Sequence, residues 1–121
     1  MTEKQFRFED LDIWKKAAEF TAGLFAIADG LEQRKCFRFA EQLRAAVLSI
    51  TNNIAEGSGS TSKSDFANFL NYARRSVFET ANILMVLSRN NYIPSAGLDR
   101  FISQLEEESR MILAFIRTLR S

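Results

Sequence analysis

The chain has 121 residues, of which 46% are hydrophobic and 26% are charged, and its formal net charge is +1. This length and composition are typical of one globular domain covering residues 1–121. The small net charge does not favour a nucleic-acid or membrane partner on average. The absence of histidine excludes imidazole-based catalytic triads and nearly all zinc sites.

The cysteine count and the hydropathy pattern narrow the class of protein further. Cys36 is the single cysteine, so an intrachain disulfide is excluded, and we expect it to be a buried structural thiol. No apolar run approaches the ~20 residues of a membrane span, and the first ten residues contain no signal-peptide core. We therefore expect a cytoplasmic protein with no membrane partner, and we predict no cofactor and no metal.

The first helix is predicted over about residues 11–28. Apolar residues recur there at helical spacing in two adjacent rows, one beginning at Ile13 and the other at Trp14. The pair Asp29-Gly30 is expected to end this helix, because glycine is favoured just past a helix C-terminus.

The second helix is predicted over about residues 35–56, and it contains no charge between Ala45 and Ala55. A surface helix of a small monomeric bundle carries charge on its outer face. We therefore expect this stretch to be enclosed by neighbouring protein, which favours an oligomer. The predicted interface consists of small, amide and apolar residues from this helix and the next: Ala45, Ala46, Ser49, Asn52, Phe78 and Met85.

The third helix is predicted over about residues 64–90, capped by Ser62 or Ser64, and the fourth over about 97–119. The triplet 106–108, three consecutive glutamates, is expected on the solvated outer face. Short connections favour antiparallel neighbours. The predicted fold is all-α, an antiparallel up-down-up-down four-helix bundle.

Several polar residues fall at positions that we expect to be buried. Glu79 lies between apolar residues one heptad away on either side, so it is expected to act as a buried clamp that sets helix register. Its candidate partners are Arg44, Asn53 and Arg75. The complete set predicted to be buried and to fix register is Gln42, Ser49, Asn53, Glu56 and Glu79.

The middle of the chain is mildly basic, since residues 31–94 carry eight Lys/Arg and five Asp/Glu. This is a weak indication of an anionic partner, and solvated charge is the alternative. We find no base-reading motif and expect no exposed aromatic platform for base stacking. The candidate anion or nucleic-acid contacts are Arg44, Lys63, Ser64, Arg74, Arg75 and Arg89.

Three stretches carry a family resemblance. They are Gln42-Leu43-Arg44-Ala45-Ala46 continuing to Asn53-Ile54-Ala55-Glu56-Gly57, the opening Phe8-Glu9-Asp10-Leu11, and Ser64-Asp65-Phe66. Together they resemble the bacterial four helix bundle proteins, also called 23S rRNA intervening sequence proteins. Two positions depart from the family pattern, because Arg75 and Asn91 stand where glycine is usual.

The resemblance implies a four-helix bundle that assembles into a homo-oligomeric ring, a pentamer. Related accessory proteins of retroelements bind nucleic acid and reverse transcriptase. The leading hypothesis is a non-enzymatic, ring-forming adaptor for RNA or for an RNA-associated protein such as a reverse transcriptase. The alternative is a scaffold that binds only proteins. No catalytic residue is predicted, because no second group accompanies any candidate acid or nucleophile.

Overall fold

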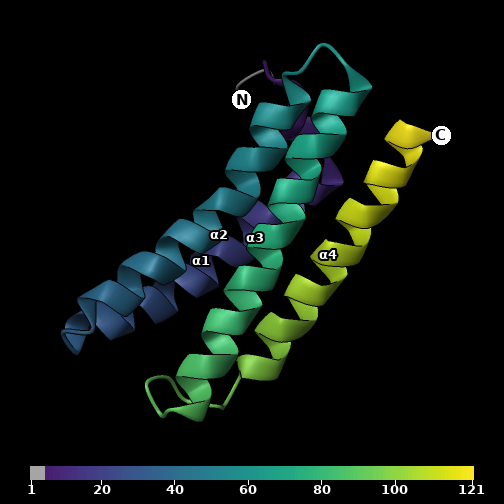
Figure 1. Cartoon of the computed structure of the whole chain (residues 1–121). Helices are drawn as coiled ribbons and strands as arrows, with labels where there is room; N and C mark the ends of the chain where they lie inside the picture. Colours follow the sequence, from purple (N-terminus) through teal and green to yellow (C-terminus); the bar gives the residue numbers. More distant parts are fainter. Residues whose placement is uncertain (1–4) are drawn as a thin grey trace.

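The computed structural model describes residues 5–121, and within them the chain is helical throughout, with no strand. A short 3-10 turn, η1 (Arg7–Asp10), precedes four α-helices of 22 to 27 residues. These helices run side by side with short connections, and the two ends of the chain lie at the same end of the molecule (Figure 1). The helices are α1 (Asp12–Gln33), α2 (Phe37–Ser58), α3 (Lys63–Arg89) and α4 (Leu98–Arg120).

The predicted end of the first helix at Asp29-Gly30 is wrong, because α1 continues to Gln33. Leu31 lies fully inside the core, so packing outweighs the helix-ending tendency of Gly30. Two residues after Gln33, Lys35 takes a left-handed conformation with φ 65° that prevents the helix from continuing. The Cys36 N–H then donates to the Leu31 carbonyl at 2.8 Å. The ends of the other three helices lie within two residues of the predicted positions.

The ends of α3 have local causes in the sequence. Ser62 caps its start, as expected, by accepting a hydrogen bond from the Asp65 N–H at 3.0 Å. After its last turn Asn91 takes a left-handed conformation with φ 63°, and the Tyr92 N–H donates to the Leu87 carbonyl at 2.9 Å. Asparagine tolerates this conformation better than most residues that carry a side chain.

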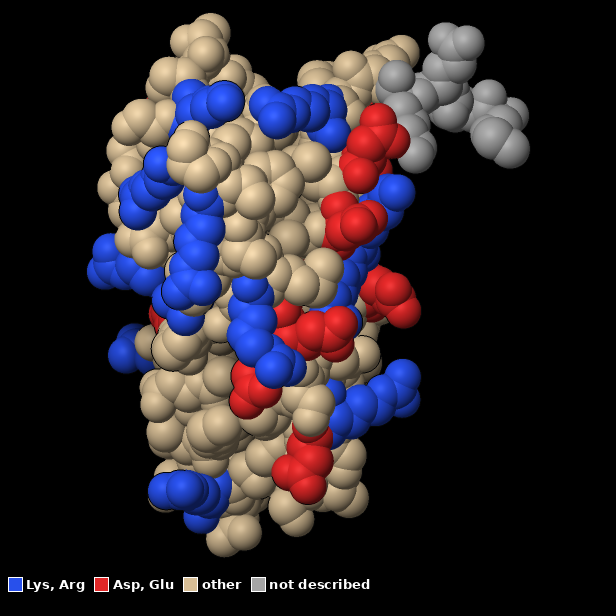
Figure 2. Space-filling model, turned by 90° about the vertical axis from the view of Figure 1, so that its right-hand side faces the viewer, with Lys and Arg blue, Asp and Glu red and all other residues tan. Residues whose placement is uncertain are grey.

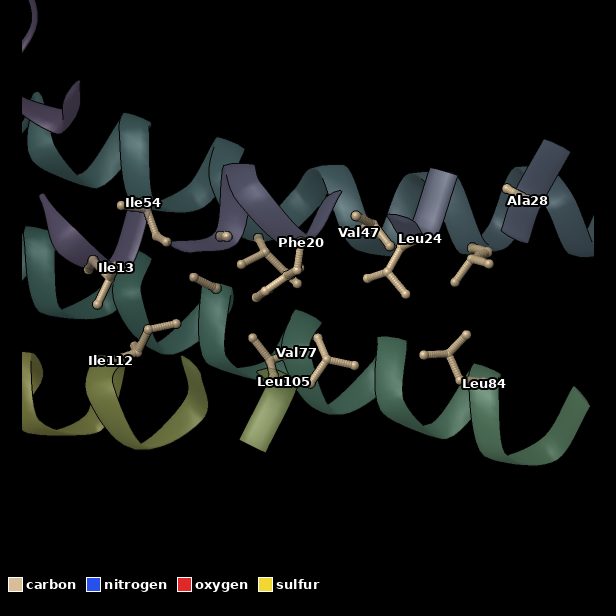
Figure 3. Packing of buried hydrophobic residues seen from close by; sticks show 14 of the residues in the cluster. Ile13, Phe20, Leu24, Ala28, Val47, Ile54, Val77, Leu84, Leu105 and Ile112 are labelled. Atoms are coloured by element: carbon tan, nitrogen blue, oxygen red, sulfur yellow. The ribbon is translucent and has the colours of Figure 1, made fainter. Parts of the chain in front are cut away.

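The core runs along the length of the molecule between the helices (Figure 3). The row that begins at Ile13 is buried, whereas Trp14 at the start of the neighbouring row is half-buried. Each helix packs chiefly on the one before it, and α4 therefore lies mainly against α3. Cys36 is half-buried at the start of α2 and is not the fully buried thiol that we expected. Core side chains labelled in Figure 3 include Phe20, Leu24, Val47, Ile54, Val77, Leu84, Leu105 and Ile112.

The end of α2 and the start of α3 approach closely at Gly57. A Cβ atom at this position would lie 2.7 Å from the Cβ of Phe69 and 2.9 Å from Cδ1 of Phe66. No larger residue fits between the two helices without displacing them, which gives the glycine of the family motif a packing role. Among the described helices, none has a segment apolar enough, over the length required, to cross a bilayer.

Candidate nucleic-acid interface

Two of the four predicted oligomer contacts of α2, Ala45 and Asn52, lie on its outward side. Ser49 is half-buried and shares a hydrogen bond with Ser76 inside the subunit. Ala45 and Asn52 are exposed, and between them Leu48 keeps 47% of its surface accessible. Ala46, however, was wrongly predicted at the interface, because it is buried inside the subunit. The error follows from helix geometry, since consecutive residues point about 100° apart and only one of the two alanines can face outward.

Three of the residues predicted to be buried register contacts, Gln42, Glu56 and Glu79, are exposed, so that prediction is wrong for them. Uncharged side chains make the polar contact between α2 and α3 instead. The Ser49 and Ser76 hydroxyl oxygens share a hydrogen bond at 2.8 Å. The Asn53 amide donates to the Ser49 carbonyl at 2.8 Å and to the Ser49 hydroxyl at 3.0 Å.

The buried carboxyl is Glu108 of α4, which corrects the prediction of a solvated triplet. Glu108 has no exposed surface, and neither of its oxygens has a hydrogen-bond partner among the described residues. Burial raises its pKa from 4.5 to about 8; the nearby Lys16 charge opposes this rise, and Glu107 adds to it. Glu107 itself is exposed and pairs with Lys16 at 3.2 Å. Glu108 is therefore largely a neutral acid at pH 7.

The six candidate anion contacts do not form one surface. Arg44 donates to Asp29 at 2.6 Å and to Glu32 at 3.3 Å, so carboxylates from α1 already neutralise its charge. The hydrogen bonds to both carboxylates raise the pKa of Arg44. Arg89 and Lys63 lie at opposite ends of α3, roughly 39 Å apart at 1.5 Å per residue. The exposed Ser64 lies beside Lys63 in the first turn of α3.

Residues of α4 complete the cationic surface that α3 begins. The Arg74 Nε donates to the Ser109 carbonyl at 3.3 Å, which places this part of α3 beside the middle of α4, next to Arg110 in sequence. On the face shown in Figure 2, Lys and Arg predominate on the left and at the top, whereas most of the visible Asp and Glu lie in the centre and on the right beside further Lys and Arg. We give the name cationic strip to six Lys and Arg of α3 and α4, two helices that pack against each other: Lys63, Arg74, Arg75, Arg110, Arg117 and Arg120.

Sequence reasoning missed the three arginines of α4. A signal for them was present, because Arg110, Arg117 and Arg120 are spaced by seven and three residues and so share one helix face. Their proximity to α3 depends on the antiparallel register of the two helices, which no single helix encodes.

Four of the six strip cations have no ion-pair partner within the described part of the chain. Arg110 pairs with Glu106 at 3.3 Å, but both side chains are about 70% exposed and such pairs are weak. The Arg74 guanidinium lies 5.0 Å from the centroid of the Phe78 ring. Lys63, Arg75, Arg117 and Arg120 make no ion pair with any residue in the range 5–121. They are therefore available to phosphate oxygens.

A groove of about 380 Å³ lies between α3 and α4 next to the strip. Its walls are mainly apolar, and Phe78 and Met85 on its rim keep 57% and 40% of their surfaces exposed. A second hollow of about 300 Å³ is lined by Arg74, Arg75 and the same Phe78. Phe78, like the 50%-exposed Tyr72, contradicts our expectation that no aromatic platform is exposed.

Over the described part of the chain, no group of three or more Cys, Asp or Glu side chains is placed to hold a metal ion. The raised pKa of Glu108 does not create an acid catalyst, because its carboxyl is sealed inside the bundle away from any substrate.

Comparisons with known proteins agree with this architecture. The sequence profile of the 23S rRNA-intervening sequence protein family matches residues 9–114. A crystal structure of a protein of unknown function from the S23 ribosomal protein family of Bacteroides thetaiotaomicron is similar, with a TM-score of 0.81 and 27% identity. The similarity covers 86% of this chain and 97% of that chain. No match was found among curated protein sequences.

Proposed function

This chain belongs to the 23S rRNA-intervening sequence protein family, and from that premise we propose that it is a non-enzymatic helical adaptor that binds RNA through the cationic strip. The observation that carries this proposal is the presence of six cations on the paired helices α3 and α4, four of which make no ion pair with any of residues 5–121. The family name supports RNA as the polyanion. The descriptions of the family and of the similar structure name no catalytic activity.

Phosphate binding accounts for this arrangement better than solvated surface charge does. Several cations on neighbouring helices match the repeating negative charge of a nucleic-acid backbone. When Lys and Arg neutralise the phosphates, the counterions condensed on the nucleic acid are released. The strip makes affinity strongly dependent on salt and largely independent of sequence. A net charge of +1 is compatible with this role, because the six cations of the strip belong to two helices that pack against each other.

We extend the proposal to a homo-oligomeric ring, a pentamer as the family resemblance implies. The outward side of α2, with Ala45, Leu48 and Asn52, supplies an uncharged surface for contact between subunits. A ring repeats the cationic strip in every subunit. One RNA molecule that binds two strips at once is therefore held more tightly than by one strip, although each strip makes the same contacts as before. An RNA-associated protein such as a reverse transcriptase is the second kind of partner that fits an adaptor.

A protein-only scaffold is the alternative function, and the groove between α3 and α4 favours it. Exposed Phe78 and Met85 on an apolar groove are typical of a surface that receives a side chain or a helix of a partner protein. This alternative predicts a partner that stays bound after nuclease treatment.

Fluorescence anisotropy with a labelled, structured RNA tests the proposal. We expect binding at 50 mM salt that weakens steeply by 300 mM, and an affinity about tenfold lower in the double variant Arg117→Ala/Arg120→Ala. The matched control, Arg38→Ala/Arg100→Ala, removes the same charge near the opposite end of the bundle and should bind nearly as well as the unchanged protein.

Two results would contradict the proposal. Equal losses in both double variants would mean that only net charge matters and that the strip is not a site. Absence of binding at low salt would remove the nucleic-acid role and leave the scaffold. Native mass spectrometry of the same samples reports subunit number and bound RNA together.

A further inference from the structure

We propose that the groove between α3 and α4 holds an unpaired base of single-stranded RNA, stacked on the Phe78 ring, with the adjoining phosphates bound by Arg74 and Arg75. This inference rests on the proposed RNA binding. It adds that the preferred RNA is single-stranded and that the Phe78 side chain makes the distinction. Phe78 is the point where the apolar groove and the hollow lined by the two arginines meet.

The exposure of Phe78 is the first observation behind this assignment. An aromatic ring left 57% accessible beside a hollow offers a face to a flat apolar ligand. Stacking of a base on an aromatic side chain needs no particular hydrogen-bond pattern, because every base has a π-face. Met85 on the same rim and Ile102 and Leu105 on the α4 wall surround the base with apolar groups.

The placement of charge is the second observation. The Arg74 guanidinium lies 5.0 Å from the Phe78 centroid and also donates to the Ser109 carbonyl, so the cation and the ring are held together. Arg75, which is exposed and makes no ion pair with any residue that the structure describes, lines the adjoining hollow. A nucleotide has a matching arrangement, because its flat base and its negatively charged phosphate lie a few ångströms apart, as the Phe78 ring and the Arg74 guanidinium do.

The polar groups of the groove also fit a nucleotide. Asn82 contributes an amide that both donates and accepts hydrogen bonds, as the edge of a base does. Glu106 on the α4 wall repels a phosphate, because its exposed ion pair with Arg110 is weak. The anionic part of the ligand is therefore directed toward the arginines of α3.

This geometry discriminates against a duplex. Bases in an RNA duplex are stacked on one another and cannot enter a groove, whereas bases of loops and single strands can. The remaining cations of the strip touch phosphates of either form. Binding of duplex RNA is thus expected to use the strip alone, and binding of single-stranded RNA to use the strip together with Phe78.

The experiment compares a labelled 12-nucleotide RNA single strand with the same strand in a duplex, using Phe78→Leu and, as the control, Tyr72→Leu. Tyr72 is a similarly exposed aromatic of α3 that does not line the groove. We expect Phe78→Leu to weaken single-strand binding by about 5- to 100-fold and to leave duplex binding unchanged. Tyr72→Leu should change neither, and circular dichroism should show both variants fully helical.

The failures of the two proposals are distinguishable. If neither RNA binds the unchanged protein at low salt, the RNA function itself fails and the inference with it. If both RNAs bind equally and Phe78→Leu changes neither affinity, the strip function stands and the stacking inference is overturned. If Phe78→Leu instead lowers the native mass of the RNA-free protein, a second copy of the chain occupies the groove, which also overturns the inference.

Discussion

The uncharged segment 45–55 of α2 and the acidic triplet 106–108 of α4 are opposite in composition, yet both turn one side to the core and another to solvent. On α2, Ala45 is exposed and Ala46 is buried; on α4, Glu107 is exposed and Glu108 has no exposed surface. Consecutive residues of a helix point about 100° apart, so neighbours of identical type acquire opposite environments. The comparison teaches that rotational phase, rather than the number of charges in a segment, decides which side is inside.

The two segments also differ in how their buried side meets polar groups. The inner side of the α2 segment forms hydrogen bonds between Ser49, Asn53 and Ser76. The inner side of the α4 triplet holds a carboxyl with no partner among the described residues, which is tolerated because the carboxyl remains protonated. The hydrogen bonds of the α2 segment therefore help to fix how α2 and α3 pack together. The buried carboxyl of the α4 triplet instead lowers the stability of the fold as the pH rises.

Replacing the two alanines of α2 is the strongest test of the comparison. Ala46→Arg places a long cation in the core without a partner, and we expect destabilisation by about 4 kcal/mol or more, sufficient to unfold the protein. Ala45→Arg, one residue away on the exposed side, should stay folded and should lower the native mass if this side of α2 joins subunits. Circular dichroism and light scattering on both variants check this.

Equal stability of Ala45→Arg and Ala46→Arg would contradict the assignment of Ala46 to the core and Ala45 to the exposed side of α2. Retention of the full native mass by a folded Ala45→Arg protein would exclude this side of α2 as the subunit contact, while leaving the fold of the subunit unaffected.

Glu108 gives the next largest expected effect, and it depends on pH. Its pKa in the folded protein is about 8, above the ordinary 4.5, so the folded state binds more protons between these two values. Stability therefore falls as pH rises from 4.5 toward 8, by up to about 1.4 kcal/mol per pH unit, and levels off above 8. Glu108→Gln should remove this slope and exceed the unchanged protein in stability by about 4 kcal/mol at pH 8.

Urea denaturation at several pH values measures this effect, and Glu107→Gln is the matched control. Glu107 is exposed and its ion pair with Lys16 lies at the surface, so its loss should change stability by less than about 1 kcal/mol. An unchanged pH slope in Glu108→Gln would show that the carboxyl is hydrated or paired in solution.

The smallest expected effect concerns the polar contact of α2. Ser76→Ala removes the partner of the Ser49 hydroxyl, which retains its contact with the Asn53 amide. We expect a loss of about 1 kcal/mol in the free energy of unfolding, the usual net value of one hydrogen bond. Thermal denaturation of Ser76→Ala beside Ser88→Ala, a half-buried serine of the same helix with no side-chain hydrogen bond, isolates that contribution. Equal melting temperatures would show that the contact adds nothing.

Much of the fold was predictable because it depends on neighbours in sequence. Apolar residues at helical spacing located the four helices, and Ser62 marked the start of α3. The end of α1 was not predictable in this way, because packing of Leu31 carries the helix through Gly30. Of the candidate site, the sequence indicated Lys63, Arg74 and Arg75, but it also included Arg44, whose charge is taken up by carboxylates of α1.

The sequence by itself determined that the chain forms four amphipathic helices joined by short turns, because helix formation, capping and turn conformation depend on residues a few positions apart. Only the tertiary structure decided that Glu108 is buried, that α4 packs with its arginines against α3, and that Phe78 borders a groove. These features depend on how far each helix is rotated about its axis and on how α3 and α4 are aligned, and contacts between residues distant in sequence set both.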